Sequence, residues 1–256
     1  MDLITPWKIA QVLAVAVIGV YTYRKDMLNA AGAFSAFLMG ALIVLFTNIL
    51  WLFLLFALLG MGSAATRFRF KEKEEAKVSE KQGGRRSTRN VIANGLAPAI
   101  LAVSAPLVAA NWGTDVAAVA YVSAIAVAAA DTFASEFGSL AKDVYLITTF
   151  RKVPAGVDGG VSLPGTIAAL AGGIVMSLLG ALLLGVLTGV LQLPLQMHIT
   201  WWTLAVPAAM GFLGCQVDSI LGATLEGEGL FTKEETNLVS IAVGGVLGFV
   251  LAFFLV

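Results

Sequence analysis

Eight apolar runs of about 20 residues fill most of this sequence and leave short connections between them. A helix of that length crosses the hydrocarbon core of a bilayer. Because 59% of the 256 residues are hydrophobic and only 12% are charged, the composition is that of a membrane protein. The sequence therefore predicts an all-α polytopic membrane bundle of about eight transmembrane helices, with seven as the alternative count. The runs lie at about 6–23, 28–46, 48–66, 91–111, 115–138, 163–192, 201–226 and 236–256.

The predicted spans leave no room for a separate soluble domain. We expect one membrane domain over residues 1–256, with a charged loop at about 67–90. Arg24 and Lys25 follow the first run where a cleavage site would need small residues, so that run is expected to be retained. The single cysteine, Cys215, excludes an intrachain disulfide. Membrane lipids are the expected surroundings, and no nucleic-acid partner is expected.

Positive charges gather in alternate connections. If the segments at 24–27, 67–90, 139–162 and 227–235 share one side, that side holds fifteen of the sixteen Lys and Arg residues, and Lys8 lies opposite. Lys and Arg in short loops favour the cytoplasmic side. We therefore expect this face in the cytoplasm and both termini outside. The first half of the 67–90 loop is expected to be a helical extension into the cytosol.

Acidic residues lie at the predicted cytoplasmic ends of two spans, in ADTFASEFG (130–138) and DSILGATLE (218–226). An ionisable group inside a bilayer costs about 2.5–3.5 kcal/mol on insertion scales, so it is a functional candidate by default. Carboxylates without His or Cys suit a hard cation such as Mg²⁺. We therefore interpret Asp131, Glu136 and Asp218 as candidate catalytic residues and metal ligands.

The spacing of two of these acids sets a geometric condition. Asp131 and Glu136 lie about 140° apart on a regular helix. They can share a metal ion only if the helix ends or breaks near Gly138, or if both flank a cavity. The alternative is that Asp131 pairs with a basic residue such as Lys142 or Arg89.

A glycine-rich segment, GVDGGVSLPGT (156–166), precedes the sixth run. Glycines let backbone amides turn toward an anion, and the N-terminus of the following helix adds free N–H groups. The segment is therefore a candidate phosphate cradle. It lacks the lysine of a P-loop and no strand is predicted before it, so a Walker motif is not supported. A plain interhelical turn is the alternative.

These segments, RNVIANG (89–95) and Lys142 together supply the candidate substrate- or nucleotide-binding residues. Each lies on the predicted cytoplasmic face and carries a cation, a carboxylate, an amide, a hydroxyl or a flexible backbone. They are Arg89, Asn94, Thr132, Ser135, Lys142, Asp158, Gly159, Gly160, Ser162, Gly165, Thr166 and Thr224.

In their order along the chain, the four segments resemble the membrane family that contains phytyl-phosphate kinase of tocopherol biosynthesis and transmembrane protein 19. The resemblance extends over nearly the whole chain. It implies Mg²⁺-dependent transfer of a phosphoryl group from a nucleoside triphosphate, with CTP favoured, to a prenyl monophosphate such as phytyl or geranylgeranyl phosphate. It places Asp131, Glu136 and Asp218 in the site. Asp158 departs from the family pattern, where Asn is expected to be common.

Two other functions stay open from the residues. One is a cytidylyltransferase-type lipid enzyme, and the other is a membrane transporter of an ion or small solute, since intramembrane acids and glycine-interrupted helices also occur in ion pathways. A transporter usually needs polar groups through both halves of the bilayer, whereas here they concentrate on one face. The length of the prenyl chain, the choice of CTP over ATP or UTP, and the oligomeric state are not fixed by the sequence.

Overall fold

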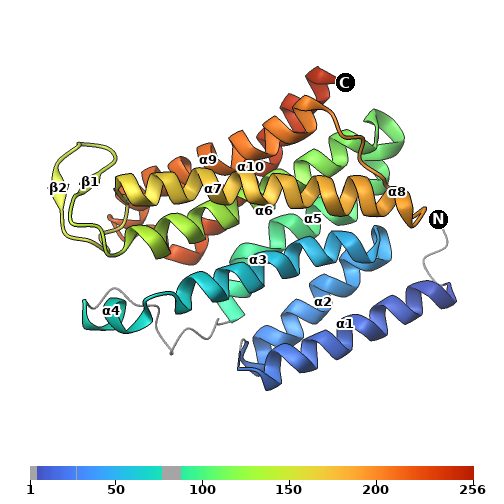
Figure 1. Cartoon of the computed structure of the whole chain (residues 1–256), viewed down its shortest axis with the longest axis horizontal. Helices are drawn as coiled ribbons and strands as arrows, with labels where there is room; N and C mark the ends of the chain where they lie inside the picture. Colours follow the sequence, from blue (N-terminus) through green and yellow to red (C-terminus); the bar gives the residue numbers. More distant parts are fainter. Residues whose placement is uncertain (1–4, 27, 77–87) are drawn as a thin grey trace.

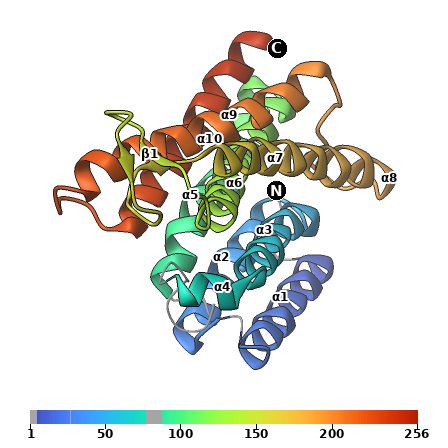
Figure 2. The same ribbon diagram turned by 60° about the vertical axis from the view of Figure 1, so that its left-hand side comes forward.

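The computed structural model describes residues 5–26, 28–76 and 88–256, and it is a bundle of helices with a small sheet at one end (Figures 1 and 2). Every predicted apolar run forms a helix, so the predicted fold class is confirmed. The elements are α1 (Pro6–Arg24), α2 (Ala30–Phe46), α3 (Ile49–Arg67), α4 (Phe70–Glu75), α5 (Thr88–Trp112), α6 (Thr114–Gly138), β1 (Val144–Leu146), β2 (Lys152–Val153), β3 (Gly160–Val161), α7 (Leu163–Gly180), η2 (Ala181–Leu187), α8 (Thr188–Val190), α9 (Trp201–Leu221), η3 (Gly222–Glu226) and α10 (Lys233–Leu255).

Length and composition single out six stretches of helix in the described residues that could cross a membrane. Four are α3, α5, α6 and α10, and the other two combine consecutive elements over Leu163–Val190 and Trp201–Glu226. Helix α2 is a shorter apolar helix, and α1 packs against it. The elements η2 and η3 are π-helical. Such turns are frequent at functional sites, and η3 is part of the cavity described below.

Helix α6 is the central element of the bundle. It packs against α3, α5, α7, α9 and α10, and every residue from Val116 to Ala130 is buried. Most of these residues are alanine or valine, which keep the helix thin and let neighbouring backbones approach closely. The last turns of α6, which carry the acidic segment, are therefore held in place by all of these neighbours.

Glycines of the surrounding helices make this close approach possible. A Cβ atom on Gly214 of α9 or on Gly244 of α10 would lie 2.3 Å from Cγ2 of Val127 in α6. A Cβ on Gly172 of α7 would lie 3.0 Å from the carbonyl oxygen of Ala129. The glycine content of these spans thus reflects helix packing around α6.

We expect Gly244→Ala to lower the stability of the protein, because the added methyl group has no space beside Val127. Overpacking of this kind costs about 1–3 kcal/mol. Gly60→Ala in α3 is the matched control, since a Cβ there meets nothing within 4 Å and alanine has the higher helix propensity. Thermal unfolding in detergent compares the two variants. Equal melting temperatures would contradict the packing argument.

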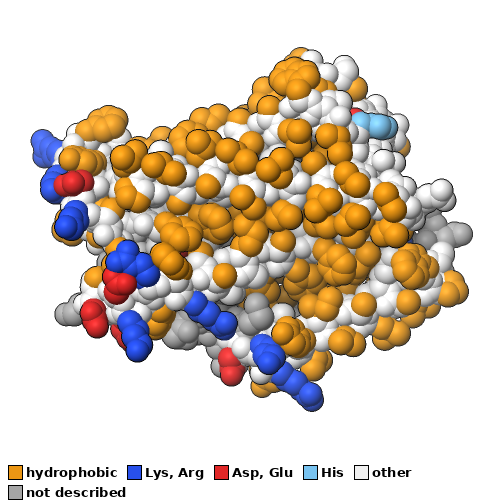
Figure 3. All heavy atoms as spheres, in the orientation of Figure 1, with side chains coloured by type: hydrophobic (Ala, Val, Ile, Leu, Met, Phe, Trp, Pro, Cys, Tyr) orange, Lys and Arg blue, Asp and Glu red, His pale blue; other side chains and the backbone are white. Residues whose placement is uncertain are grey.

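Charged side chains gather at one end of the molecule. Figure 3 shows them around the end that carries α4, β1 and β2, while apolar side chains cover most of the remaining face. Helix α1 begins and α10 ends at the opposite end (Figure 1), as an even number of crossings requires. There, Lys8 Nζ donates hydrogen bonds of 2.5 Å to the carbonyl oxygens of Val44 and Thr47 at the end of α2. Which membrane side each end faces stays a prediction.

The connection between α6 and α7 contains a sheet that the sequence did not predict. Strand β1 pairs antiparallel with both β2 and β3 in the order β2-β1-β3. In the exposed hairpin, Lys152 Nζ lies 2.5 Å from Asp143 Oδ1, and this hydrogen bond holds the pKa of the Asp143 carboxyl below its ordinary value. The sheet fixes the glycine-rich segment over one end of the bundle.

The charged loop at 67–90 is described over 67–76 and 88–90. Its first half forms α4, as expected for a helical extension, but α4 does not simply project into solvent. Lys73 in its middle is 1% exposed, because it reaches inward to the end of α6. Residues 77–87, including the Gly83–Gly84 pair and the arginines that follow it, lie outside the described residues.

Candidate functional site

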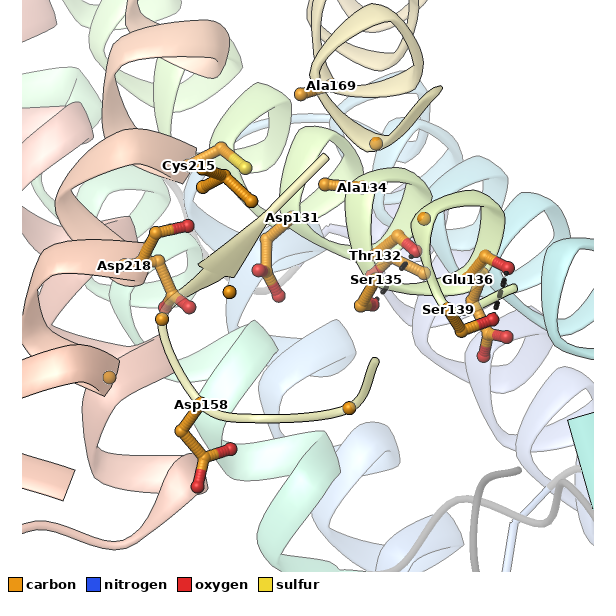
Figure 4. A pocket seen from close by; sticks show the side chains of 18 of the residues that line it. Asp131, Thr132, Ala134, Ser135, Glu136, Ser139, Asp158, Ala169, Cys215 and Asp218 are labelled. Atoms are coloured by element: carbon orange, nitrogen blue, oxygen red, sulfur yellow. Dashed lines mark hydrogen bonds between the residues drawn. The ribbon is translucent and has the colours of Figure 1, made fainter. Parts of the chain in front are cut away.

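A cavity of about 760 Å³ opens at the charged end of the bundle. Its wall is built from the last turns of α3 and α6, the segment 155–162, the first turns of α5, α7 and α10, the end of α9 and η3. These segments are far apart in the sequence, and the fold brings them together around the end of α6. Figure 4 shows part of this wall. Most of the residues predicted from the sequence to form a site line this cavity.

Asp131 and Asp218 form the acidic centre of the cavity. Asp131 comes from α6 and Asp218 from α9, and the two carboxylates lie close enough to interact (Figure 4). Ser240 Oγ of α10 donates a hydrogen bond of 2.8 Å to Asp218 Oδ1, which orients that carboxylate. Ala169 and Cys215 line the cavity beside the pair. The structure therefore brings together two of the three predicted catalytic acids.

Glu136 is not part of this acidic centre. Helix α6 runs without a break to Gly138, so Glu136 points away from Asp131, as the regular helical spacing requires. Its Oε2 lies 2.6 Å from Lys73 Nζ, and its Oε1 accepts a hydrogen bond of 2.6 Å from Thr66 Oγ1. The described residues contain no group of three His, Cys, Asp or Glu placed to hold one metal ion. Glu136 therefore lies apart from the Asp131–Asp218 pair, and its role as a third metal ligand stays a prediction that this geometry does not favour.

The polar side chains next to these acids make local hydrogen bonds. Thr132 Oγ1 donates to the carbonyl oxygen of Ala128, and Ser135 Oγ donates to that of Thr132. Asn94 is 7% exposed, and its Nδ2 donates to the carbonyl oxygen of Asn90. Thr132, Ser135 and Asn94 all line the cavity, and their binding role stays a prediction.

The glycine-rich segment lines the cavity from Gly156 to Ser162, and its glycines serve conformation and packing. Gly156 and Gly159 have φ of +85° and +73°, which favour glycine. A Cβ on Gly165 would lie 3.0 Å from the carbonyl oxygen of Ala134, so α7 starts directly on the end of α6. Asp158 belongs to this segment, and its side chain points away from the Asp131–Asp218 pair in Figure 4.

The first turn of α7 offers fewer amides than the predicted phosphate cradle assumed. Ser162 caps the helix, with Oγ accepting from the amide of Gly165 at 3.2 Å. The amide of Thr166 bonds to the carbonyl oxygen of Ser162, and Pro164 has no N–H. In the preceding segment, the amide of Gly160 likewise bonds to the carbonyl oxygen of Val157 at 2.9 Å.

Three predicted binding residues do not line the cavity. Arg89 is exposed in the first turn of α5 and acts electrostatically on Glu235. Lys142 is exposed in the connection after α6. Thr224 Oγ1 donates to the carbonyl oxygen of Ile220 within its own helix. The alternative pairing of Asp131 with Arg89 or Lys142 stays a prediction.

Lys233 and Asn237 are among the residues of the wall that were not predicted from the sequence. Lys233 begins α10, lines the cavity and acts electrostatically on Asp218. Asn237 lies one turn later and is 7% exposed, with no hydrogen-bond partner for its buried Oδ1 in the described residues. Both lie in TKEETN, which reads as an ordinary helix start, so the sequence carried no signal for them beyond their position on the charged face.

The described wall is strongly acidic, with one Lys, Lys233, and no Arg. A phosphorylated substrate entering this wall needs a cation to offset repulsion from the carboxylates. Asp131 and Asp218 supply oxygen ligands, which suit Mg²⁺, and this ion is ordinarily held by one or two carboxylates together with substrate phosphates and water. The donor set therefore fits Mg²⁺ with two protein carboxylates instead of three. The acids of the wall are Asp131, Glu136, Asp158, Asp218, Glu226 and Glu234.

The comparisons with known proteins match nearly the whole chain. The family described as integral membrane protein DUF92 matches residues 13–247. An uncharacterised membrane protein of Methanocaldococcus jannaschii is 32% identical over 238 residues, which are 93% of this chain and 91% of that protein. In Arabidopsis thaliana, Protein VTE6, chloroplastic, is 30% identical (89% of this chain, 66% of that protein), and Protein PGR is 29% identical (85% and 78%). No solved structure matches the chain.

Proposed function

The chain belongs to the DUF92 family of integral membrane proteins, and from that membership we propose that it transfers a phosphoryl group from a nucleoside triphosphate to a prenyl monophosphate. This is the family that the four sequence motifs indicated. The observation that carries the proposal is the pair Asp131 and Asp218, facing one cavity at the polar end of an apolar bundle.

The position of the cavity suits a substrate with a soluble and an apolar part. Its wall combines carboxylates and the glycine-rich segment with apolar residues such as Ala169 beside the acids. A prenyl chain can stay in hydrocarbon while its phosphate meets a nucleotide from the aqueous side. The same reasoning applies to a lipid cytidylyltransferase, so the identity of the product separates these two functions.

In the proposed reaction, an oxygen of the acceptor monophosphate attacks the γ-phosphorus of the nucleotide. The bond from that phosphorus to the β–γ bridging oxygen breaks, and the products are a prenyl diphosphate and a nucleoside diphosphate. Phosphoryl transfer depends mainly on positioning and on neutralising charge. Bound Mg²⁺ would supply that neutralisation, and Asp131 and Asp218 would hold it. The acceptor phosphate is already ionised, so no general base is required.

Lys233 and the glycine-rich segment have supporting roles in this proposal. Lys233 is placed to offset negative charge on the phosphates, and the backbone of the glycine-rich segment lies along the cavity where they would bind. Preference for CTP over ATP or UTP rests on the resemblance to the family of phytyl-phosphate kinase. Phytyl and geranylgeranyl phosphate are the acceptors to test first.

Transport is supported less well by the arrangement of polar residues. The cavity is confined to the charged end, and α6 continues beyond it as a buried run of mainly alanine and valine from Val116 to Ala130. A transport pathway would need polar groups through the opposite half as well. In the described residues, no comparable polar series follows the cavity along α6.

The assay that tests the proposal uses purified protein in lipid nanodiscs with Mg²⁺, one nucleoside triphosphate and geranylgeranyl monophosphate. We expect geranylgeranyl diphosphate and nucleoside diphosphate in equal amounts, detected by mass spectrometry. Release of pyrophosphate with a nucleotidyl-lipid product would support the cytidylyltransferase instead. Absence of any nucleotide-dependent product with phytyl, geranylgeranyl and farnesyl phosphates, together with solute flux in liposomes, would overturn the proposal in favour of transport.

A further inference from the structure

Lys73 is the buried member of a strongly charged segment. Helix α4 has the sequence FKEKEE, in which Lys71, Glu72 and Glu74 are exposed whereas Lys73 is 1% exposed. Lysine is almost never fully buried unless it is paired. The burial of this one side chain therefore indicates a specific contact between α4 and the membrane bundle.

That contact is a compact polar cluster around Glu136. Lys73 Nζ donates hydrogen bonds to Glu136 Oε2 at 2.6 Å and to the carbonyl oxygen of Ala65 at 3.0 Å. Thr66 Oγ1 donates to the other carboxylate oxygen at 2.6 Å. Both oxygens of Glu136 are thus engaged, and the ammonium group also offsets the negative end of α3.

An aromatic contact joins the same elements beside this cluster. Phe68, between α3 and α4, lies against Phe137 of α6 with ring centroids 5.4 Å apart. Phe137 in turn contacts Phe133 one turn earlier, at 5.6 Å. The turn between α3 and α4 is therefore fixed to the last turns of α6 by a polar and an aromatic contact together.

Glu136 and Thr66 also line the cavity that holds Asp131 and Asp218. We propose that Glu136 is a positioning residue: Lys73 of α4 and Thr66 of α3 hold its carboxylate at the edge of the cavity, and these contacts fix the last turn of α6, which forms part of the wall. The expected effect on nucleotide binding rests on the proposed function, whereas the contact between Lys73 and Glu136 is independent of that function.

A double-mutant cycle on thermal stability tests the contact without any assay of activity. Glu136→Gln and Lys73→Met each leave one buried charge without its partner, which is strongly destabilising, so each is expected to lower Tm by about 5 °C or more. The double variant K73M/E136Q removes both charges and is expected to recover at least half of that loss. The matched control is K71M/E74Q, on the exposed side of α4, with a Tm within about 1 °C of the parent protein.

Two functional measurements separate positioning from metal ligation. With Mn²⁺ as the probe, we expect Glu136→Gln to bind the ion as the parent protein does, whereas Asp131→Asn loses it. In the kinase assay, Glu136→Gln and Lys73→Met should each raise KM for the nucleotide about tenfold with kcat little changed, the signature of lost ground-state binding. The double variant should recover part of the change in KM.

Additive effects of Lys73→Met and Glu136→Gln on Tm would contradict the contact between the two side chains. Loss of Mn²⁺ binding in Glu136→Gln would contradict the positioning role of Glu136. Unchanged KM in a variant with lowered Tm would restrict Lys73 and Glu136 to stability and so contradict the proposal. Failure of the proposed function is distinguishable from these results, because it would leave the stability cycle intact while no prenyl phosphate is turned over by the parent protein.

Discussion

Asp131→Asn and Asp218→Asn are each expected to reduce turnover by on the order of a thousandfold or more. Either change removes a charged ligand from the pair that would hold Mg²⁺, while the shape of the side chain is kept. Initial rates of prenyl diphosphate formation measure the effect, and Mn²⁺ binding by electron paramagnetic resonance shows whether the ion is lost in parallel.

The same variants should be as stable as the parent protein or more stable. Two carboxylates facing one another in a partly buried cavity destabilise each other, and an amide in place of one of them relieves that repulsion. A variant with lost activity and undiminished Tm is the result expected of a functional pair. A lowered Tm with proportionately lost activity would instead indicate a structural role.

Asp143→Asn is the control for this experiment. It makes the same chemical change at the same end of the molecule, but Asp143 is exposed and contacts Lys152 in the hairpin. We expect its turnover to match that of the parent protein. Substantial turnover by Asp131→Asn or Asp218→Asn would contradict the proposed metal site, and this holds for any result with Asp143→Asn.

The helices could be predicted from the sequence because the bilayer restricts what a long apolar run can be. In hydrocarbon every backbone amide needs an internal partner, and a helix provides these bonds within one segment. Each apolar run therefore defined its own secondary structure, without knowledge of its neighbours. The concentration of positive charge in alternate connections also predicted that Asp131 and Asp218 lie at the same end of the bundle, where the structure places them together.

The role of Glu136 could not be predicted in the same way. Its partner Lys73 lies 63 residues earlier in the sequence, inside a run of charges of both signs that is typical of a solvated surface. Nothing in that run distinguishes the one lysine that turns inward. The small sheet was missed for a related reason, because strands of two or three residues carry no periodic pattern and depend on the contacts that fix the loop.

The glycine-rich segment gives the second large expected effect. Gly159→Ala should reduce turnover by about a hundredfold or more and lower Tm by several degrees. A Cβ at this position would lie 2.4 Å from Cβ and 2.5 Å from the amide nitrogen of Ala223 in η3. The segment cannot easily move away, since the amide of Ile147 bonds to the carbonyl oxygen of Gly159 at 3.0 Å. The amides beside the cavity would therefore be displaced.

Gly229→Ala is the matched control, because Gly229 has a φ of +75° and a Cβ there meets nothing within 4 Å. Both variants force alanine into the left-handed region, which costs about 1–2 kcal/mol, and they differ in the contact with η3. Equal losses of turnover and of Tm in the two variants would assign the effect to backbone conformation alone. Adding Ala223→Gly to Gly159→Ala removes the contact between the two Cβ atoms but leaves the one with the amide nitrogen. Recovery should therefore be partial, and complete recovery would mean that the segment does not lie against the backbone of η3.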